Sequence, residues 1–304
     1  MGKFAKVLDK MIREGISKEE YEKFYFETRN RDEKSFLSSL SLRTRQKLHK
    51  TLLSVLKIKN RLEGFRCEVI NDERSNMQDR PIIFVPSHVG KFDIELISEA
   101  IKEHYYLLTY DYENIKGTLD ALFLDLNGVF YFLKSNKTDR KRVKDNMVTH
   151  LKKGGNILYF IEGEWNFTPN LMVLPVYWGI VDIARESNAV ILPIGVCQYE
   201  KTFLVNIGTY FDMKEYGDSQ EEKTRVITDL RDILATLVWE IYETKKCKRS
   251  EITSDYWDTY VDERLGEWSN ITMDMINENI YKPKGIVTWE EVFEPIRKSH
   301  NRKG

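Results

Sequence analysis

The sequence predicts an α/β fold in which a mostly parallel central sheet is flanked by helices. Short apolar runs rich in β-branched residues alternate with longer stretches whose apolar residues recur every three or four positions. The run Ile82 to Val85 is bounded by Pro81 and Pro86, which is typical of a buried central strand. Strands that alternate with helices are usually parallel, because each crossover helix returns the chain to the same end of the sheet.

The chain divides into three parts. Its 304 residues can bury a large core, as one large domain or two small ones. We expect a helical N-terminal segment at residues 1–62, an α/β domain at 63–215 and a helical C-terminal segment at 216–304 that packs on the same domain. The C-terminal tail is rich in aromatic residues, among them Trp257, Tyr260, Trp268 and Trp289.

The N-terminal segment contains three candidate helices. Residues 3–13 form a basic amphipathic pattern, which suits either a helix that packs on its own domain or one that lies on an anionic bilayer. Ser17 and Glu20 form a capping box that begins a helix extending to about Thr28. A third helix is expected over 41–61 and ends before Gly64.

The α/β part is predicted element by element from the same two periodicities. After the strand at 82–85, a helix begins at Phe92 or Asp93 and ends by His104. The remaining strands are expected at 65–70, 105–110, 129–133, 156–161, 190–196 and 203–207, and the remaining helices at 117–126, 140–153, 176–186 and 225–246.

Composition excludes several classes of protein. The 47 basic and 48 acidic residues nearly cancel, so no overall charge indicates a nucleic-acid partner. Three widely spaced cysteines provide neither a disulfide framework nor a metal site and fit a reducing cytoplasm. No apolar stretch approaches the length of a membrane span, and the N-terminus lacks the pattern of a signal peptide. We therefore expect a cytoplasmic protein whose membrane contact, if it has one, is peripheral and on the inner face.

His88 and Asp93 are the candidate catalytic pair. His88 follows a strand at its carboxyl end, where ligands bind in open α/β sheets, and Asp93 lies at the start of the next helix. A carboxylate there can hold the imidazole in one tautomer while the other ring nitrogen removes a proton from a hydroxyl. The alternative is that Asp93 caps its helix and His88 is a loop residue. Because no Ser or Cys stands in a G-x-S-x-G pattern, direct attack by a substrate hydroxyl is favoured over a covalent intermediate.

Four segments in order along the chain resemble the motifs of the glycerolipid acyltransferase family, which contains the lysophospholipid and glycerol-phosphate acyltransferases. The segment 87–93, S-H-V-G-K-F-D, resembles the N-H-x-x-x-x-D block, and 128–134, G-V-F-Y-F-L-K, resembles the second motif, a glycine, an apolar strand and a basic residue. The segment 160–165, F-I-E-G-E-W, resembles F-P-E-G-T-R, and 190–194, V-I-L-P-I, resembles an apolar strand with a central proline. The resemblance covers residues 81 to 208.

This resemblance implies an O-acyltransferase of lipid metabolism. His88 would act as general base, oriented by Asp93, and the second and third motifs would bind the acceptor. The donor would be a thioester, acyl-CoA or acyl carrier protein, used as co-substrate with no tightly bound cofactor, so an acyl carrier protein is a possible partner. The acceptor-binding residues implied are Lys134, Glu162, Gly163, Glu164 and Trp165, and those implied for the donor or the oxyanion are Lys91, Gly90 and Pro193.

The chain departs from the family where the family usually carries cations. Lys134 stands in place of an arginine in the second motif, and Glu164 and Trp165 replace the threonine and arginine of the third. Tyr177 and Trp178 replace two lysines of a downstream segment. Aromatic side chains suit a sugar, an aromatic or an apolar acceptor better than a phosphate.

Two questions of function stay open at this point. The acceptor is a lysophospholipid-like molecule or another lipid or polyol, with a non-phosphorylated acceptor, a non-catalytic lipid-binding protein of the same fold, and an esterase as the alternatives. The basic residues between Lys134 and Lys144 fit a phosphate, the diphosphate of coenzyme A, an acidic carrier protein, an anionic membrane or simply a solvated helix face.

The two interpretations of residues 3–13 predict different outcomes on deletion of residues 1–14. If this segment binds the membrane, the shortened protein binds anionic vesicles more weakly in a sedimentation assay and keeps its folded domain. Loss of soluble expression instead supports the packing role.

Overall fold

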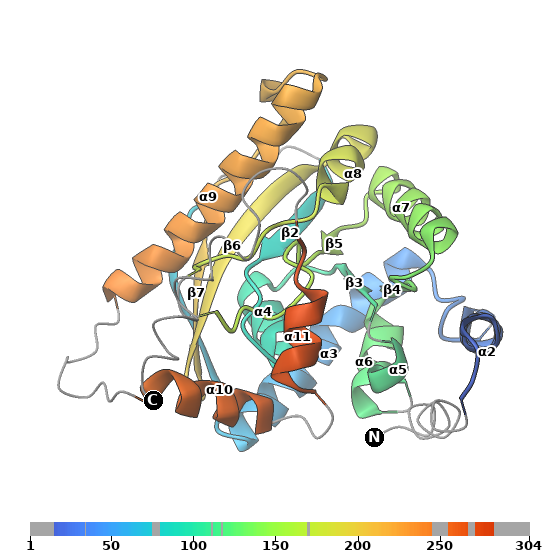
Figure 1. Ribbon diagram of the computed structural model, residues 1–304, viewed down its shortest axis with the longest axis horizontal. Coiled ribbons are helices and arrows are strands. Elements are labelled where there is room, and N and C mark those ends of the chain that lie inside the picture. The colour runs from blue at the N-terminus through green and yellow to red at the C-terminus, as the bar shows by residue number, and fades with distance from the viewer. Residues whose placement is uncertain are drawn as a thin grey trace.

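A computed structural model describes residues 15–33, 35–74, 80–110, 112–116, 118–168, 171–244, 255–266 and 271–282. A central sheet runs through the molecule, with helices on both of its faces (Figure 1). The strands are β1 (Arg66–Asp72), β2 (Ile82–Pro86), β3 (Tyr106–Thr109), β4 (Val129–Tyr131), β5 (Ile157–Leu158), β6 (Val190–Tyr199) and β7 (Thr202–Ile207). The predicted mostly parallel α/β fold is confirmed.

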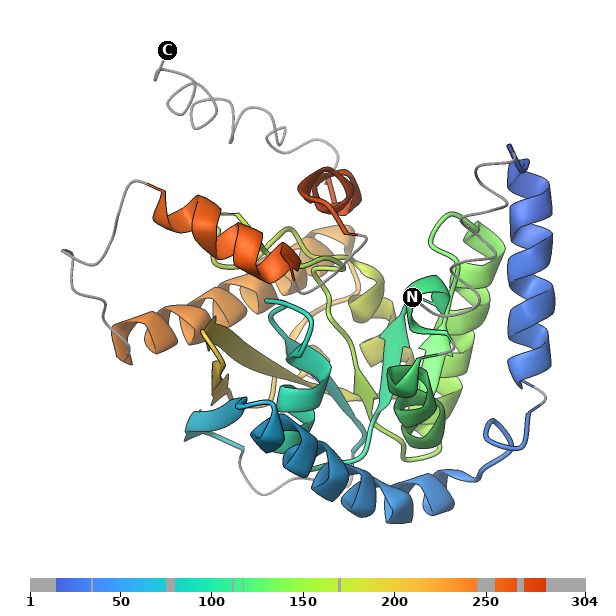
Figure 2. The ribbon, with the colours of Figure 1, turned by 90° about the horizontal axis from the view of Figure 1, so that it is seen from below.

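The helices described are α2 (Lys18–Glu33), α3 (Leu42–Leu62), α4 (Asp93–Ile101), α5 (Tyr112–Ile115), α6 (Leu119–Asn127), α7 (Lys137–Lys152), α8 (Gly179–Ser187), α9 (Gln220–Thr244), α10 (Tyr256–Gly266) and α11 (Met273–Asn279), with a 3₁₀ turn at Met213–Glu215. Helices α3 and α9 lie on opposite faces of the sheet (Figure 2). The helical N-terminal and C-terminal segments that the sequence predicts are therefore present.

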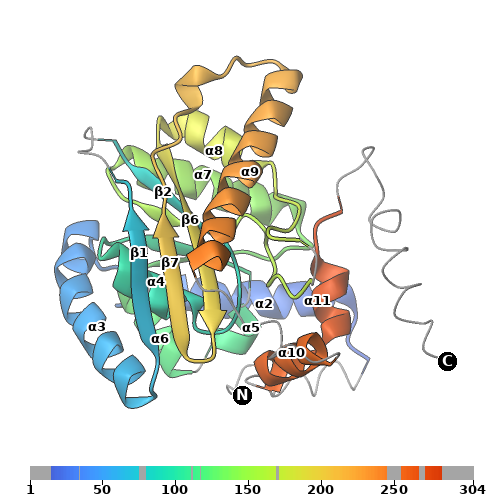
Figure 3. The same cartoon turned by 90° about the vertical axis from the view of Figure 1, so that its left-hand side faces the viewer.

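The sheet has seven strands in the order β1-β7-β6-β2-β5-β3-β4. All neighbours are parallel except β6 and β7, which form an antiparallel hairpin. The strand β2 is the fourth of the seven, so the segment before His88 is central, as predicted. Figure 3 shows the sheet from its β1 edge, between α3 and α9.

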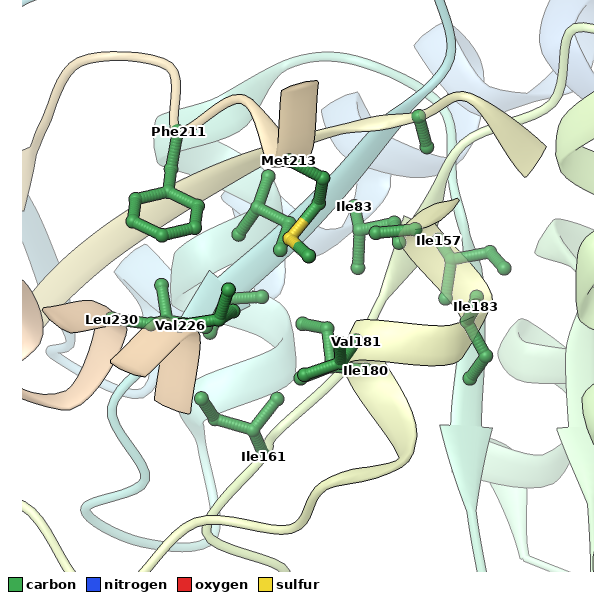
Figure 4. Close-up of a cluster of buried hydrophobic side chains, with 14 of the residues drawn as sticks. Ile83, Ile157, Ile161, Ile180, Val181, Ile183, Phe211, Met213, Val226 and Leu230 are labelled. Atoms are coloured by element: carbon green, nitrogen blue, oxygen red, sulfur yellow. The ribbon is translucent and has the colours of Figure 1, made fainter. Parts of the chain in front are cut away.

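The strand β2 is buried on both faces because its side chains alternate between two cores. Ile83 and Val85 pack with α7, α8 and α9, in the cluster drawn in Figure 4. Ile82 and Phe84 pack on the other face with α4. All five residues of β2 are buried, which explains why its sequence carries no polar residue.

Local signals predicted the starts of α2 and α3 and the end of α3, whereas α2 continues to Glu33, beyond the expected end near Thr28. Ser17 and Glu20 form the reciprocal capping box, with Ser17 N–H donating to Glu20 Oε2 at 3.0 Å. The Ser41 side chain accepts from Thr44 N–H and begins α3. Gly64, with φ of 85°, follows α3 where the chain turns into β1. Residues 3–13, Trp268 and Trp289 lie outside the described residues.

Two elements differ from the prediction close to the site. The strand expected over 156–161 pairs only through Leu158, because Gly163 N–H donates to Phe160 O and closes a turn. The helix expected from Val176 begins at Gly179, since Tyr177 N–H donates to Ile161 O and keeps that segment extended. Both changes bring loop backbone to the carboxyl edge of the sheet.

Two buried histidines, His49 and His104, and the half-buried His150 lie at the amino-terminal edge of the sheet, where β3 and β5 begin. His49 Nδ1 and His104 Nε2 each lie 2.7 Å from an oxygen of Asn127, and His150 Nε2 is 3.2 Å from the Asn156 carbonyl oxygen. Burial lowers the pKa of His104 and of His150 to about 4, and also lowers that of His49. These side chains are therefore neutral in the folded protein near neutral pH.

These histidines predict a loss of stability in acid. Between pH 6.5 and about 4 the unfolded chain binds protons that the folded His104 and His150 do not, so the free energy of unfolding falls as the pH falls through this range. Each histidine adds up to about 1.4 kcal/mol per pH unit to the slope. His150→Gln keeps a donor for the Asn156 carbonyl. When the free energy of unfolding is measured by urea titration at a series of pH values, we expect it to fall less steeply with falling pH in this variant than in the wild type. Equal slopes would contradict the assignment.

Candidate active site

His88 lies on the loop that joins β2 to α4, and β6 fixes the start of this loop. Ser87 N–H donates to the Ile194 carbonyl at 2.9 Å. The Ser87 hydroxyl accepts from Val196 N–H at 2.8 Å and lies 3.2 Å from the Val196 carbonyl. The residue before His88 is therefore bonded to β6 through both its amide and its hydroxyl, at the carboxyl edge of the sheet.

Asp93 holds both the His88 ring and the loop. Its Oδ2 lies 2.7 Å from His88 Nδ1 and accepts from the backbone N–H groups of Val89 at 2.7 Å and Gly90 at 3.0 Å. Asp93 is fully buried and is the first residue of α4, whereas the N-cap position belongs to Phe92. Asp93 thus binds the imidazole as expected of an orienting carboxylate. With Nδ1 engaged, Nε2 is the ring nitrogen that can exchange a proton with a substrate.

Aromatic side chains fix the plane of the imidazole. The Phe160 ring stacks on it, with centroids 4.0 Å apart and planes 24° from parallel. The Trp165 ring meets it at 67°, with centroids 5.8 Å apart. The His88 side chain keeps 18% of its surface exposed, so it is held on three sides and open on the fourth.

The Glu162 carboxyl group links the His88 loop to the segment that contains Leu174. Its Oε1 accepts from His88 N–H at 2.9 Å and its Oε2 from Leu174 N–H at 2.6 Å. The residue has no exposed surface, and this burial raises the pKa of its carboxyl to about 8. The sequence predicts that Glu162 binds the acceptor, but the structure places it beneath the cavities described below, tying the third motif to the backbone of the first.

Two cavities meet at His88. The first, here called the α11 cavity, has a volume of about 790 Å³ and lies between α3, α4, α6 and α11. The second, called the α7 cavity, has a volume of about 500 Å³ and lies beside α7 and α8. Five residues line both cavities: His88, Ile94, Thr109, Tyr110 and Gly163. A group in either cavity can thus approach the same imidazole.

The α7 cavity combines an apolar interior with a cationic mouth. Phe132, Met147 and Ile183 are among the apolar residues that line it. The ammonium groups of Lys137 and Lys141 are exposed at its mouth, and no hydrogen bond or ion pair engages them within the described part of the chain. Such a cavity suits a molecule with an apolar chain and an anionic end.

The other predicted site residues are divided between the two cavities and the sheet. Gly90, Lys91, Glu164 and Trp165 line the α11 cavity, and Lys134 lines the α7 cavity. The Gly90 amide, expected near the donor or oxyanion, already donates to Asp93. Pro193, expected in the same role, lines neither cavity: it is buried within β6, paired with Val85. This strand supports the end of β2 instead.

Gly163 is required at the turn between the two cavities. Its φ is 70°, and an added Cβ would lie 2.4 Å from a carbon of the Tyr177 ring. Its amide N–H donates to Phe160 O at 3.1 Å and so closes the turn. Only glycine satisfies both the backbone angle and the close approach of Tyr177.

The sequence did not predict that α11 and the residues before it form part of the site. Ile271, Met275, Ile276 and Asn279 line the α11 cavity. Tyr110, also missed, donates its hydroxyl to Glu164 Oε2 at 2.8 Å and lines both cavities. The aromatic content of the C-terminal tail was the one signal, and it indicated only that the tail packs on the domain.

Within the described residues, no group of His, Cys, Asp and Glu side chains is placed to hold a metal ion. In the same part of the chain, every helix is too short or too polar to span a bilayer.

Comparison with known proteins agrees with the geometry. Residues 66–197 match the family described as Acyltransferase, and this segment contains His88, Asp93 and the other three motifs. No curated protein sequence matches the chain. A similar solved structure is that of the 1-acyl-sn-glycerophosphate (LPA) acyltransferase PlsC from Thermotoga maritima, with 18% identity and a TM-score of 0.53 over 67% of this chain and 83% of that one.

At this level of identity the likeness to PlsC shows a shared fold. The family match adds what the fold alone does not, because it spans the loop that carries His88 and Asp93 and the turn that carries Glu162. Residues 66–197 therefore match an acyltransferase family in sequence, on a fold that the chain shares with a known acyltransferase.

Proposed function

We propose that this protein moves an acyl group from a thioester, acyl-CoA or acyl carrier protein, to the hydroxyl of a lysophospholipid-like or other lipid or polyol acceptor. The observation that carries the proposal is the 2.7 Å contact between His88 Nδ1 and Asp93, made where the two cavities meet. One cavity can hold the donor and the other the acceptor. Because its substrates are lipids, the proposed place of action is the inner membrane surface.

The chemistry needs only these residues and the two substrates. His88 Nε2 removes the proton of the acceptor hydroxyl as its oxygen attacks the thioester carbonyl, and Asp93 stabilises the imidazolium that forms. The tetrahedral intermediate then collapses, the carbon–sulfur bond breaks, and the thiolate takes the proton from the imidazolium. The products are an ester and a free thiol. Lys91, which lines the α11 cavity beside His88, is a candidate to stabilise the oxyanion.

We assign the donor to the α7 cavity. Its apolar interior suits an acyl chain, and Lys137 and Lys141 at its mouth suit the phosphates of coenzyme A or the acidic surface of a carrier protein. The acceptor then occupies the α11 cavity, which is lined by Glu164 and Trp165 of the third motif.

The alternatives are less well supported. In a non-catalytic lipid-binding protein, lipid binding would not require a buried carboxylate such as that of Asp93, whose three hydrogen bonds all go to His88 and its loop. An esterase needs only one organic substrate, whereas here two separate cavities open on the same imidazole. Transfer between two bound substrates fits this arrangement better than transfer to water.

His88→Ala tests the general base. We expect the rate of acyl transfer to fall by about 10² to 10⁴, because this is the usual contribution of a positioned base. The assay follows release of thiol from acyl-CoA with a panel of lysophospholipid, glycerol phosphate, sugar and polyol acceptors, and thermal unfolding verifies the fold. A variant that keeps most of the wild-type rate would refute the mechanism.

Asp93→Asn tests the orienting role. The amide still reaches the His88 ring, but it favours the wrong tautomer and cannot stabilise imidazolium. We therefore expect kcat to fall much more than the affinity for either substrate, measured by initial rates and by equilibrium binding. A loss confined to KM would show that Asp93 serves only to order the loop.

Lys137→Ala combined with Lys141→Ala tests the assignment of the donor. Because both side chains are exposed at the mouth of the α7 cavity, we expect a higher KM for the acyl thioester, a smaller effect at high salt and an unchanged KM for the acceptor. Lys153→Ala, an exposed lysine just after the far end of α7, is the matched control. A rise in the KM of the acceptor alone would exchange the roles of the two cavities.

A further inference from the structure

The C-terminal helix α11 lies across the open side of the catalytic site, in front of the carboxyl edge of the sheet (Figure 1). Its residues Met275, Ile276 and Asn279 line the α11 cavity together with His88 and Trp165. This helix lies outside the segment that matches the acyltransferase family, which ends at residue 197. An acceptor in the cavity therefore touches a wall that the family domain does not supply.

Lys134 binds this helix directly. Its Nζ donates to the backbone oxygen of Asn279 at 3.1 Å and lies 3.3 Å from Asn279 Oδ1. It also lies 4.9 Å from the centre of the Tyr110 ring. The cation of the second motif is thus occupied by two neutral oxygens of Asn279, a residue that lines the α11 cavity.

A carboxylate stands beside this pair. Glu164 lines the α11 cavity, receives the Tyr110 hydroxyl, and is close enough to Lys134 to oppose the lowering of the lysine pKa by burial. A phosphate bound by Lys134 would therefore have to displace Asn279 and approach Glu164. A hydroxyl group without charge would do neither.

The aromatic residues of the site hold α11 in place. Trp165 and Phe167 pack with Val261 of α10 and Ile276 of α11 in one apolar cluster. The Tyr177 ring lies 4.5 Å from that of Tyr281, just after α11. Together with Lys134 and Asn279 these contacts attach the helix at three points, so Asn279 is a fixed part of the cavity wall.

We propose that Asn279, held by Lys134 and aided by Glu164, makes this enzyme select hydroxyl acceptors with a neutral head group over phosphorylated ones. The inference rests on the acyl transfer proposed above and names the class of acceptor. Asn279 engages the ammonium group of Lys134, which is then less able to bind a phosphate, and the Glu164 carboxylate repels the phosphate. A monoacylglycerol and a lysophosphatidic acid with the same acyl chain differ only in the phosphate, so they form the matched pair of probes.

The experiment measures kcat/KM for these two acceptors with one acyl-CoA, in the wild type and in variants. We expect the wild type to favour the monoacylglycerol at least tenfold. Asn279→Ala removes the side-chain oxygen and leaves Lys134 only the backbone oxygen of residue 279, and Glu164→Gln removes the negative charge. Each should move the ratio at least tenfold toward lysophosphatidic acid, because a charge-assisted contact is worth about that much or more. Asn279→Asp should keep the preference, since the new carboxylate still engages Lys134.

Asn277→Ala is the matched control, because it removes the same side chain from an exposed position of the same helix. It should leave both values unchanged, and the unfolding temperature of each variant verifies the fold. A wild type that prefers lysophosphatidic acid, or an Asn279→Ala variant that gains equally on both acceptors, would overturn the inference while transfer itself persists. Absence of transfer to either acceptor would overturn the proposed function as well.

Discussion

The candidate active site depends on one buried oxygen, Oδ2 of Asp93, which binds the His88 ring and two backbone amides of the same loop. A carboxylate without exposed surface loses its hydration, and these hydrogen bonds replace it at Oδ2, whereas Oδ1 has no hydrogen-bond partner within the described residues. Removing the imidazole would leave the carboxylate under-bonded, and removing the carboxylate would release the loop. The orientation of the His88 ring and the conformation of the loop therefore depend on the same oxygen atom.

Glu162 extends this arrangement across the sheet. It lies under the same loop, accepts the His88 amide, and its raised pKa owes a further contribution to the nearby charge of Asp93. The like charge of Asp93 adds to the larger effect of burial on the pKa of Glu162. Asp93 has three donors on one oxygen and Glu162 has two backbone donors spread over both of its oxygens. Asp93 therefore receives more hydrogen bonds from this loop than Glu162 does.

Sequence reasoning succeeded where the determinants are local. His88 and Asp93 are five residues apart, so one strand, one turn and one helix start place them together, and the pattern of Ile82 to Val85 predicted a central strand correctly. It was less successful for Glu162 and Pro193, because a motif predicts a place in the fold and not whether a side chain faces a cavity. The contact of Lys134 with Asn279 spans 145 positions, and no local pattern encodes it.

Trp165 also makes contacts with residues far along the chain that its local sequence does not reveal. Considered alone, a tryptophan beside a catalytic loop indicates a platform for a ring-shaped acceptor. In the structure only 9% of it is exposed, its ring meets the imidazole of His88, and it packs with Val261 and Ile276. Its size serves to attach the C-terminal segment next to the base. Tyr177 serves the same end, because its ring contacts that of Tyr281 just after α11. A helix that lies over the site needs apolar contacts beneath it, and Trp165 and Tyr177 supply them.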